Sequence, residues 1–229
     1  MTERDGGRGR TTRPSPPKPD TGVAGVVLAG GRSRRFPPGD KALATLDGRP
    51  LVAHAVDALR PVVDEVVVNC RADQRAALAD ALDPLPTRFA VDDREDAGPV
   101  AGLAAALSAT EARYAAVLPC DRPVVGTALL ARLLSAARGE SGAVARFDER
   151  RQPFPLVVHV RVGRSTSRRM LDAGASLASL LAELDPVEVP ETEVRALAPA
   201  TAFTDVDEPA DLRRLEALSA ADAPARGRR

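Results

Sequence analysis

Short runs of consecutive apolar residues alternate with segments of helical periodicity along most of this chain, and this alternation limits the folds open to it. The first run ends at Ala29, the second is centred on residues 66–68, and later runs end at Val91 and Leu118. Strands that are apolar on both faces belong to sheets that helices cover on both sides. The alternation therefore predicts an α/β fold, a Rossmann-like, mostly parallel, twisted sheet with helices on both faces.

The elements follow one another at the intervals of strand–helix–strand units. We expect strands at residues 22–29, 65–69, 87–91, 114–118, 143–147, 156–160 and 187–189. We expect helices at residues 50–59, 73–82, 98–109, 126–137, 177–184 and 210–218. The polar stretch 148–152 lies between two of these strands and predicts a hairpin.

The two ends of the chain differ in composition from the rest. Residues 1–20 contain four prolines with scattered arginine and glycine, and the chain closes on Arg226-Gly227-Arg228-Arg229. Such segments bury too little apolar surface to offset the entropy lost on ordering. We therefore predict a single domain over residues 21–218, between disordered tails at 1–20 and 219–229.

Composition and charge exclude several classes of protein. The 32 basic and 32 acidic residues cancel, and aromatic residues make up only 3% of the chain. A nucleic-acid or membrane partner is therefore not expected, and no apolar run reaches the ~18 residues of a membrane span. The cysteines, Cys70 and Cys120, and the histidines, His54 and His159, form no metal-ligand pattern. We expect a cytoplasmic protein in which these four residues have structural roles.

A loop rich in glycine and arginine follows the first predicted strand. It begins Gly30-Gly31-Arg32-Ser33-Arg34-Arg35 and leads to Gly39-Asp40-Lys41. The glycines let the backbone approach a bound group with its N–H donors exposed, and the cations can neutralise a triphosphate. It lacks the Gly-Lys-Ser/Thr ending of a Walker A loop and the G-x-G-x-x-G spacing of a dinucleotide fingerprint. Its place at the end of a strand favours a phosphate site over a merely solvated basic loop.

Polar residues also follow the next three predicted strands. Asn69 ends the second strand, four acids within 92–96 follow the third, and Asp121 follows the fourth. A carboxylate at the place of Asp121 can hold Mg²⁺ between phosphates, and the amide of Asn69 can contact a base or a ribose. Each has a structural alternative, because these residue types also favour turns and helix N-termini.

Two of the candidate residues belong to amino-acid types that are rare in this chain, lysine and asparagine. Of the 32 basic residues only Lys18 and Lys41 are lysines, and Asn69 is the only asparagine. Arginine does not mimic the compact ammonium group at a phosphate, and aspartate does not supply the amide donor. Their retention supports Lys41 and Asn69 as ligand contacts.

Four segments together resemble the molybdenum cofactor guanylyltransferase family, the nucleotidyltransferases of molybdopterin-guanine dinucleotide biosynthesis. They are residues 25–31 with Ser33, Arg35 and Gly39-Asp40-Lys41, then 46–51, Gly98-Pro99-Val100-Ala101-Gly102 and Cys120-Asp121-Arg122-Pro123. They occur in the family's order and spacing over nearly the whole predicted domain. Sugar and isoprenoid nucleotidyltransferases share the first segment, so the four carry the resemblance only in combination.

The resemblance implies a GT-A-like nucleotidyltransferase fold and an enzyme that uses Mg²⁺. Its reaction would transfer GMP from GTP to the phosphate of the molybdenum-molybdopterin cofactor and release pyrophosphate. Partner proteins would be those that make or accept the cofactor. By position, the residues that bind GTP would be Leu28, Ala29, Gly30, Gly31, Lys41, Asn69, Asp92 and Asp121. The catalytic residues would be Lys41, Arg35 and Asp121, with Asp121 also the metal ligand.

Some alternatives remain open. The loop after the third strand varies in length, so Asp93 is the alternative to Asp92. Asp205-Val206-Asp207-Glu208-Pro209 departs from the family's usual Asn-x-Asn-Thr-Pro, and aspartates at those places also occur in related cytidylyltransferases. A cytidylyl- or other nucleotidyltransferase on the same fold is therefore one alternative function. A nucleotide-binding regulator without catalysis is the other.

Overall fold

A seven-stranded sheet runs through the part of the chain that the computed structural model describes, residues 22–32, 35–36, 39–92 and 98–222. The strand order is β5-β4-β1-β6-β8-β7-β9. The strands are β1 (Val23–Leu28), β4 (Glu65–Cys70), β5 (Arg88–Val91), β6 (Tyr114–Pro119), β7 (Gly142–Phe147), β8 (Arg150–His159) and β9 (Val187–Val189). Only β8 runs antiparallel to its neighbours in this sheet. The predicted mostly parallel sheet is confirmed.

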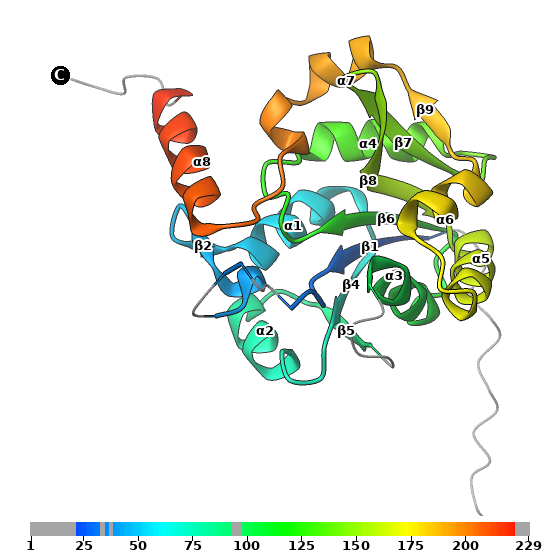
Figure 1. Cartoon of the computed structure of the whole chain (residues 1–229), viewed down its shortest axis with the longest axis horizontal. Coiled ribbons are helices and arrows are strands. Elements are labelled where there is room, and N and C mark those ends of the chain that lie inside the picture. Colours follow the sequence, from blue (N-terminus) through cyan, green and yellow to red (C-terminus); the bar gives the residue numbers. More distant parts are fainter. Residues whose placement is uncertain (1–21, 33–34, 37–38, 93–97, 223–229) are drawn as a thin grey trace, which may run out of the picture.

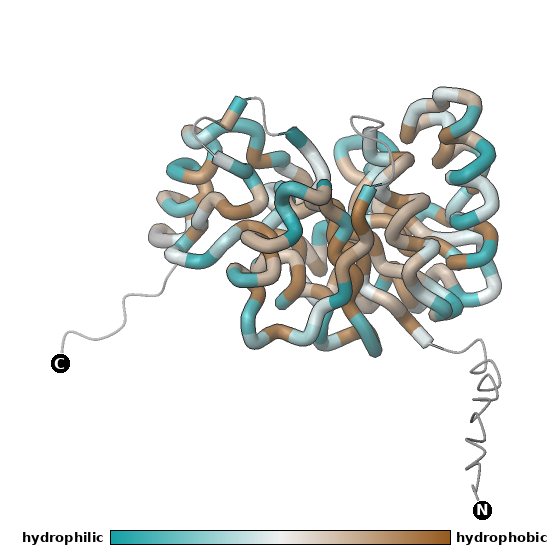
Figure 2. Tube along the Cα trace, turned by 90° about the horizontal axis from the view of Figure 1, so that it is seen from below, coloured by the Kyte–Doolittle hydropathy of each residue, from teal (hydrophilic) through white to brown (hydrophobic). Residues whose placement is uncertain are grey.

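Helices cover both faces of the sheet (Figure 1). One face packs against α1 (Leu51–Leu59), α2 (Arg75–Leu82), α4 (Thr127–Ala136) and α7 (Glu191–Leu197). The other packs against α3 (Gly98–Ser108), α5 (Val160–Asp172) and α6 (Leu177–Leu184). Successive strand residues serve opposite faces, because Val27 belongs to the first core and Val26 to the second. Figure 2 accordingly shows the hydrophobic segments gathered at the centre of the body.

The remaining elements lie at the edge of this sandwich. A small hairpin pairs β2 (Thr45–Leu46) with β3 (Arg49–Pro50), and α8 (Pro209–Asp222) stands beside it (Figure 1). Three 3₁₀ turns complete the described chain: η1 (Lys41–Leu43), η2 (Arg60–Val62) and η3 (Ala200–Phe203). No helix among the described residues combines the length and the apolar character of a membrane span.

The register of the central strands places their carboxyl ends side by side. Leu28 at the end of β1 pairs with Asn69 of β4 on one side and with Pro119 of β6 on the other. The strand order therefore keeps β4 and β6 apart, and the buried thiols of Cys70 and Cys120 are free. The same order brings the polar residues that follow β1, β4, β5 and β6 to one edge of the sheet.

The structure differs from the sequence prediction in the C-terminal half. The polar stretch 148–152 is mostly strand, because a tight turn with positive φ at Asp148 and Glu149 already closes the hairpin. The strand expected at 156–160 begins at Arg150 and ends at His159, where α5 starts. The last helix continues to Asp222, so placing residues 219–222 in a disordered tail was wrong. The expected tails at 1–20 and 223–229 lie outside the described residues.

Two helices, α5 and α7, have no counterpart in the sequence prediction. The buried residues of α5 are Val160, Gly163, Thr166 and Ser167, and Met170 and Leu171 are partly buried, so its apolar residues lie at its two ends rather than along its length. Gly163 allows a close approach to β8, since a Cβ atom there would lie 2.7 Å from Cγ2 of Val158. A helix whose middle packs through small and polar residues gives only a weak signal in a search for hydrophobic periodicity.

Candidate active site

A cavity of about 640 Å³ opens at the edge of the sheet where the central parallel strands end. Residues from the loops after β1, β4, β5 and β6 line it. Among them are all eight residues predicted to bind the nucleotide: Leu28, Ala29, Gly30, Gly31, Lys41, Asn69, Asp92 and Asp121. Asp93, the alternative to Asp92, lies outside the described residues. The structure thus brings the predicted residues together, while their contacts with a nucleotide stay predictions.

Lys41 lies between two carboxylates. Its Nζ donates to Oδ2 of Asp121 at 2.7 Å and to Oδ1 of Asp207 at 3.3 Å. Burial lowers the pKa of Lys41, but the charge and hydrogen bond of Asp121 outweigh this effect, so the pKa lies above its ordinary value. The ammonium group therefore stays charged at neutral pH and can stabilise negative charge that develops on a phosphate.

Arg35, the third predicted catalytic residue, is placed differently. Its side chain is 75% exposed and its Nη1 lies 3.2 Å from Oδ2 of Asp207. It is not part of the cavity wall, and it reaches the site only through that carboxylate. A catalytic role for Arg35 stays a prediction that needs a movement of its side chain toward the phosphates.

One wall of the cavity is built around the buried side chain of Asn69. Its Nδ2 donates to Oδ1 of Asp92 at 2.6 Å and to the carbonyl of Ala90 at 3.3 Å. Two glycines make this arrangement possible. A Cβ atom on Gly102 would collide with Oδ1 of Asn69, and one on Gly30 would collide with Oδ2 of Asp92. Only glycine leaves room for the two side chains at these positions.

A layer of side chains that the sequence analysis missed supports the first loop. Gln74 is buried and its Nε2 donates to the carbonyl of Ala29 at 3.0 Å and to the carboxylate of Asp40. Arg71 donates through Nη1 to the carbonyls of Gly30 at 3.2 Å and Gly31 at 2.5 Å. In the sequence, both look like ordinary polar residues before a helix, so no local signal distinguishes them.

The carboxylate that this cavity offers suits a divalent ion that completes its coordination with oxygens of a substrate. The described residues hold no cluster of three or more His, Cys, Asp or Glu side chains that would form a complete metal site. Asp121, with a side chain that is 22% exposed, offers one carboxylate at the edge of the sheet. Mg²⁺ binds in this way, through one or two carboxylates, water and the oxygens of a phosphate substrate.

The cysteines and histidines are not reactive groups of this site. Burial raises the pKa of the Cys70 thiol to about 11 and also raises the pKa of Cys120, so both are protonated at neutral pH and poor nucleophiles. His54 bonds through Nε2 to the carbonyl of Leu46 at 2.9 Å, and His159 packs edge-on against Tyr114. Neither histidine is among the residues that line the cavity.

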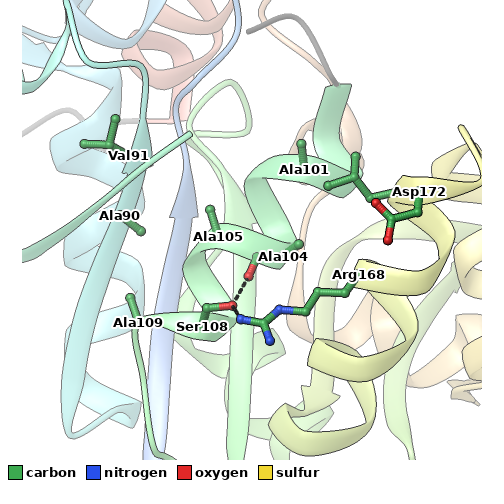
Figure 3. A pocket seen from close by; sticks show the side chains of 10 residues that line it. Ala90, Val91, Ala101, Ala104, Ala105, Ser108, Ala109, Arg168 and Asp172 are labelled. Carbon is green, nitrogen blue, oxygen red and sulfur yellow. Dashed lines mark hydrogen bonds between the residues drawn. The ribbon is translucent and has the colours of Figure 1, made fainter. Parts of the chain in front are cut away.

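A second hollow of about 440 Å³ lies between β5, α3 and α5 (Figure 3). Five of the ten residues that line it are alanines. Arg168 donates to Oγ of Ser108 at 2.9 Å, and this hydroxyl donates to the carbonyl of Ala104 at 2.7 Å. These polar groups bind one another rather than converging on a ligand. We assign no chemistry to this hollow.

Comparison with known proteins decides the family. Residues 25–188 match the model of the MobA-like NTP transferase domain. A probable molybdenum cofactor guanylyltransferase from Haloferax mediterranei is 44% identical over 197 residues, which cover 86% of this chain and 94% of the relative. The chain belongs to the molybdenum cofactor guanylyltransferase family. It is a nucleotidyltransferase, and the resemblance on which we based the prediction is confirmed.

Solved structures show how widely this family's fold is shared. Molybdopterin-guanine dinucleotide biosynthesis protein A from Archaeoglobus fulgidus superposes with a TM-score of 0.72 at 22% identity, covering 86% of this chain and 99% of that one. A Mycobacterium tuberculosis protein solved in complex with manganese gives a TM-score of 0.63 at 21% identity, with 86% and 99% coverage. These likenesses establish the fold.

The close approach of Gly102 to Asn69 can be tested by adding one methyl group. We expect Gly102→Ala to displace the Asn69 amide and to weaken nucleoside triphosphate binding by about tenfold, the equivalent of one lost hydrogen bond. Calorimetric titration measures the affinity. Gly126→Ala is the matched control, because a Cβ atom there would meet nothing within 4 Å. Alanine favours a helix more than glycine does, so the substitution itself should not destabilise α3. Unchanged nucleotide binding in Gly102→Ala would contradict the close packing of Gly102 against Asn69.

Proposed function

We propose that this nucleotidyltransferase transfers GMP from GTP to the phosphate of the molybdenum-molybdopterin cofactor and releases pyrophosphate. The position of Lys41 and Asp121 carries the proposal. They lie between the wall formed by Asn69 and Asp92 and a second wall formed by residues 153–154 and Leu177. The cavity thus has a nucleoside end and an acceptor end with the charged groups in between. The name of the Haloferax relative supports GTP and the cofactor as the two substrates.

The reaction needs charge stabilisation more than proton transfer. An oxygen of the acceptor phosphate, already ionised at neutral pH, attacks the α-phosphorus of GTP. The bond from this phosphorus to the oxygen that bridges to the β-phosphate breaks, and pyrophosphate leaves with the electron pair. Lys41 neutralises charge on the phosphates, and the preformed loop 28–31 orients them for in-line attack. No general base is required, which is consistent with a cavity wall without histidine.

Asp121 is the residue we propose for holding Mg²⁺ together with phosphate oxygens. When bound, the ion would supply a second positive charge at the phosphates. Asp207 contacts the same ammonium group as Asp121, and we propose its carboxylate as a second ligand of the ion. The manganese complex of the Mycobacterium neighbour supports a divalent ion in this fold.

We expect the reaction in the cytoplasm, where GTP is available.

The nucleotide and the activity are tested in one experiment. Pyrophosphate release is measured with Mg²⁺, the molybdopterin cofactor and GTP, CTP or ATP in parallel. We expect release with GTP that depends on the acceptor. Faster release with CTP would replace the proposal with a cytidylyltransferase, and binding without release for every nucleotide would replace it with a regulator.

Lys41 can be tested against the only other lysine of the chain. We expect Lys41→Ala to lower kcat at least ~10²-fold, as the loss of one charge contact to a transition state does. Lys18→Ala is the matched control and should leave kcat unchanged. Steady-state pyrophosphate release measures both variants. A kcat of Lys41→Ala within a few-fold of the parent enzyme would exclude Lys41 from the reaction.

Asp121 can be tested through the metal dependence of the rate. Asn keeps the size of the side chain but removes its charge, so we expect Asp121→Asn to abolish Mg²⁺-dependent turnover. The side chain is partly exposed, and the fold should persist, as circular dichroism would report. A variant that keeps its turnover and its response to Mg²⁺ concentration would show that another group holds the ion.

A further inference from the structure

Arg122 is a buried cation at the acceptor end of the cavity that the mechanism above does not use. The residue is only 6% exposed. Its Nε donates to Oδ1 of Asp205 at 2.6 Å, and its Nη1 donates to the carbonyl of Phe154 at 2.5 Å. A guanidinium group taken out of water is tolerated only with partners of this kind. The guanidinium group is therefore held in one place and in turn fixes the positions of Asp205 and of the Phe154 carbonyl.

The two partners of Arg122 come from distant parts of the chain. Phe154 lies in β8, and Asp205 belongs to the closing segment, which we define as residues 205–207, just before α8. Arg122 itself follows β6 and is the neighbour of Asp121. The Arg122 side chain thus connects the end of β6 to two segments that line the acceptor end, one in β8 and one just before α8.

The backbone that follows Asp205 is anchored by hydrogen bonds at three successive residues, Val206, Asp207 and Glu208. The N–H of Val206 donates to the carbonyl of Asp121 at 2.8 Å, and its side chain is fully buried. The N–H groups of Asp207 and Glu208 both donate to Oδ2 of Asp211 at 3.0 Å. With its backbone held in this way, Asp207 directs its carboxylate at Lys41.

We infer that Arg122 is a positioning residue for the acceptor: it holds Asp205 and the carbonyl of Phe154 so that the closing segment keeps Asp207 in contact with the ammonium group of Lys41. The nucleoside end does not depend on it, because Asn69 lies in β4 and Asp92 follows β5, both on the other side of β1. The inference rests on the proposed function for the identity of the acceptor, but not for the placement of the closing segment.

Matched variants separate this role from simple stabilisation of the fold. Arg122→Gln removes the cation, and Arg122→Lys keeps the charge without the two-pronged geometry. Asp205→Asn removes the partner charge at a side chain that is 48% exposed, so it is the variant least able to disturb folding. Arg132→Gln is the control, because Arg132 pairs with Glu193 at 2.7 Å outside the cavity.

We expect Arg122→Gln to raise the KM for the molybdopterin cofactor at least ~10-fold, the value of a charge-assisted hydrogen bond. The Kd for GTP should change less than ~2-fold. Asp205→Asn should show the same split, Arg122→Lys should recover part of the loss, and Arg132→Gln should change neither constant. The double variant Arg122→Gln/Asp205→Asn should lose no more than Arg122→Gln alone, because both act on one contact.

The placement of the closing segment has a readout that does not need turnover. Hydrogen exchange followed by mass spectrometry should show faster exchange at the Val206 amide in Arg122→Gln than in Arg132→Gln. If no nucleotide supports turnover in the parent enzyme, the proposed function fails while this exchange measurement still decides the inference. Equal losses of GTP and acceptor binding, or unchanged exchange at residues 205–207, would overturn it.

Discussion

The ion pair between Lys41 and Asp121 connects the parts of this molecule that form the site. Asp207 shares the same ammonium group, so three segments separated by 80 and more residues meet at one Nζ atom. The pair is largely shielded from water. Removing Lys41 would leave the Asp121 carboxylate as an uncompensated charge, whereas Lys41 has a second carboxylate partner in Asp207. In the proposed reaction a triphosphate would bring further negative charge to the same ammonium group. The position of the ammonium is thus set before a substrate arrives, which is the arrangement that electrostatic catalysis requires.

The first loop is fixed in a comparable way by hydrogen bonds rather than by charge. Gln74 and Arg71 bind the carbonyls of three successive residues, 29–31. Their peptide planes are therefore oriented by side chains on the β4–α2 connection. At the neighbouring strand end, Gly30 and Gly102 leave the space that Asp92 and Asn69 occupy. Small residues and buried amides together give the proposed nucleoside end a shape that exists without a ligand, which lowers the entropy lost on binding.

The sequence was sufficient for the features that depend on apolar patterning and on strand order. Continuous apolar runs identified the central strands, and the ends of parallel strands had to meet at one edge, so Lys41, Asn69, Asp92 and Asp121 could be grouped in advance. The pattern failed where burial involves polar or small residues. The buried face of α5 contains Gly163 and Ser167, and Gln74 is buried by its hydrogen bonds. Partners far apart in sequence, such as Arg122 and Asp205, carry no local signal at all.

The aspartates of the closing segment pose a problem of charge, because a site for phosphates is a poor place for extra carboxylates. In the structure each of these two aspartates is paired with at least one cationic side chain. Asp205 faces the buried Arg122, and Asp207 faces Arg35 as well as Lys41. Where the family usually has neutral asparagines, this chain therefore combines acids with arginines in a locally balanced set. The departure from the family motif is compensated within the site, so it does not by itself argue for a different reaction.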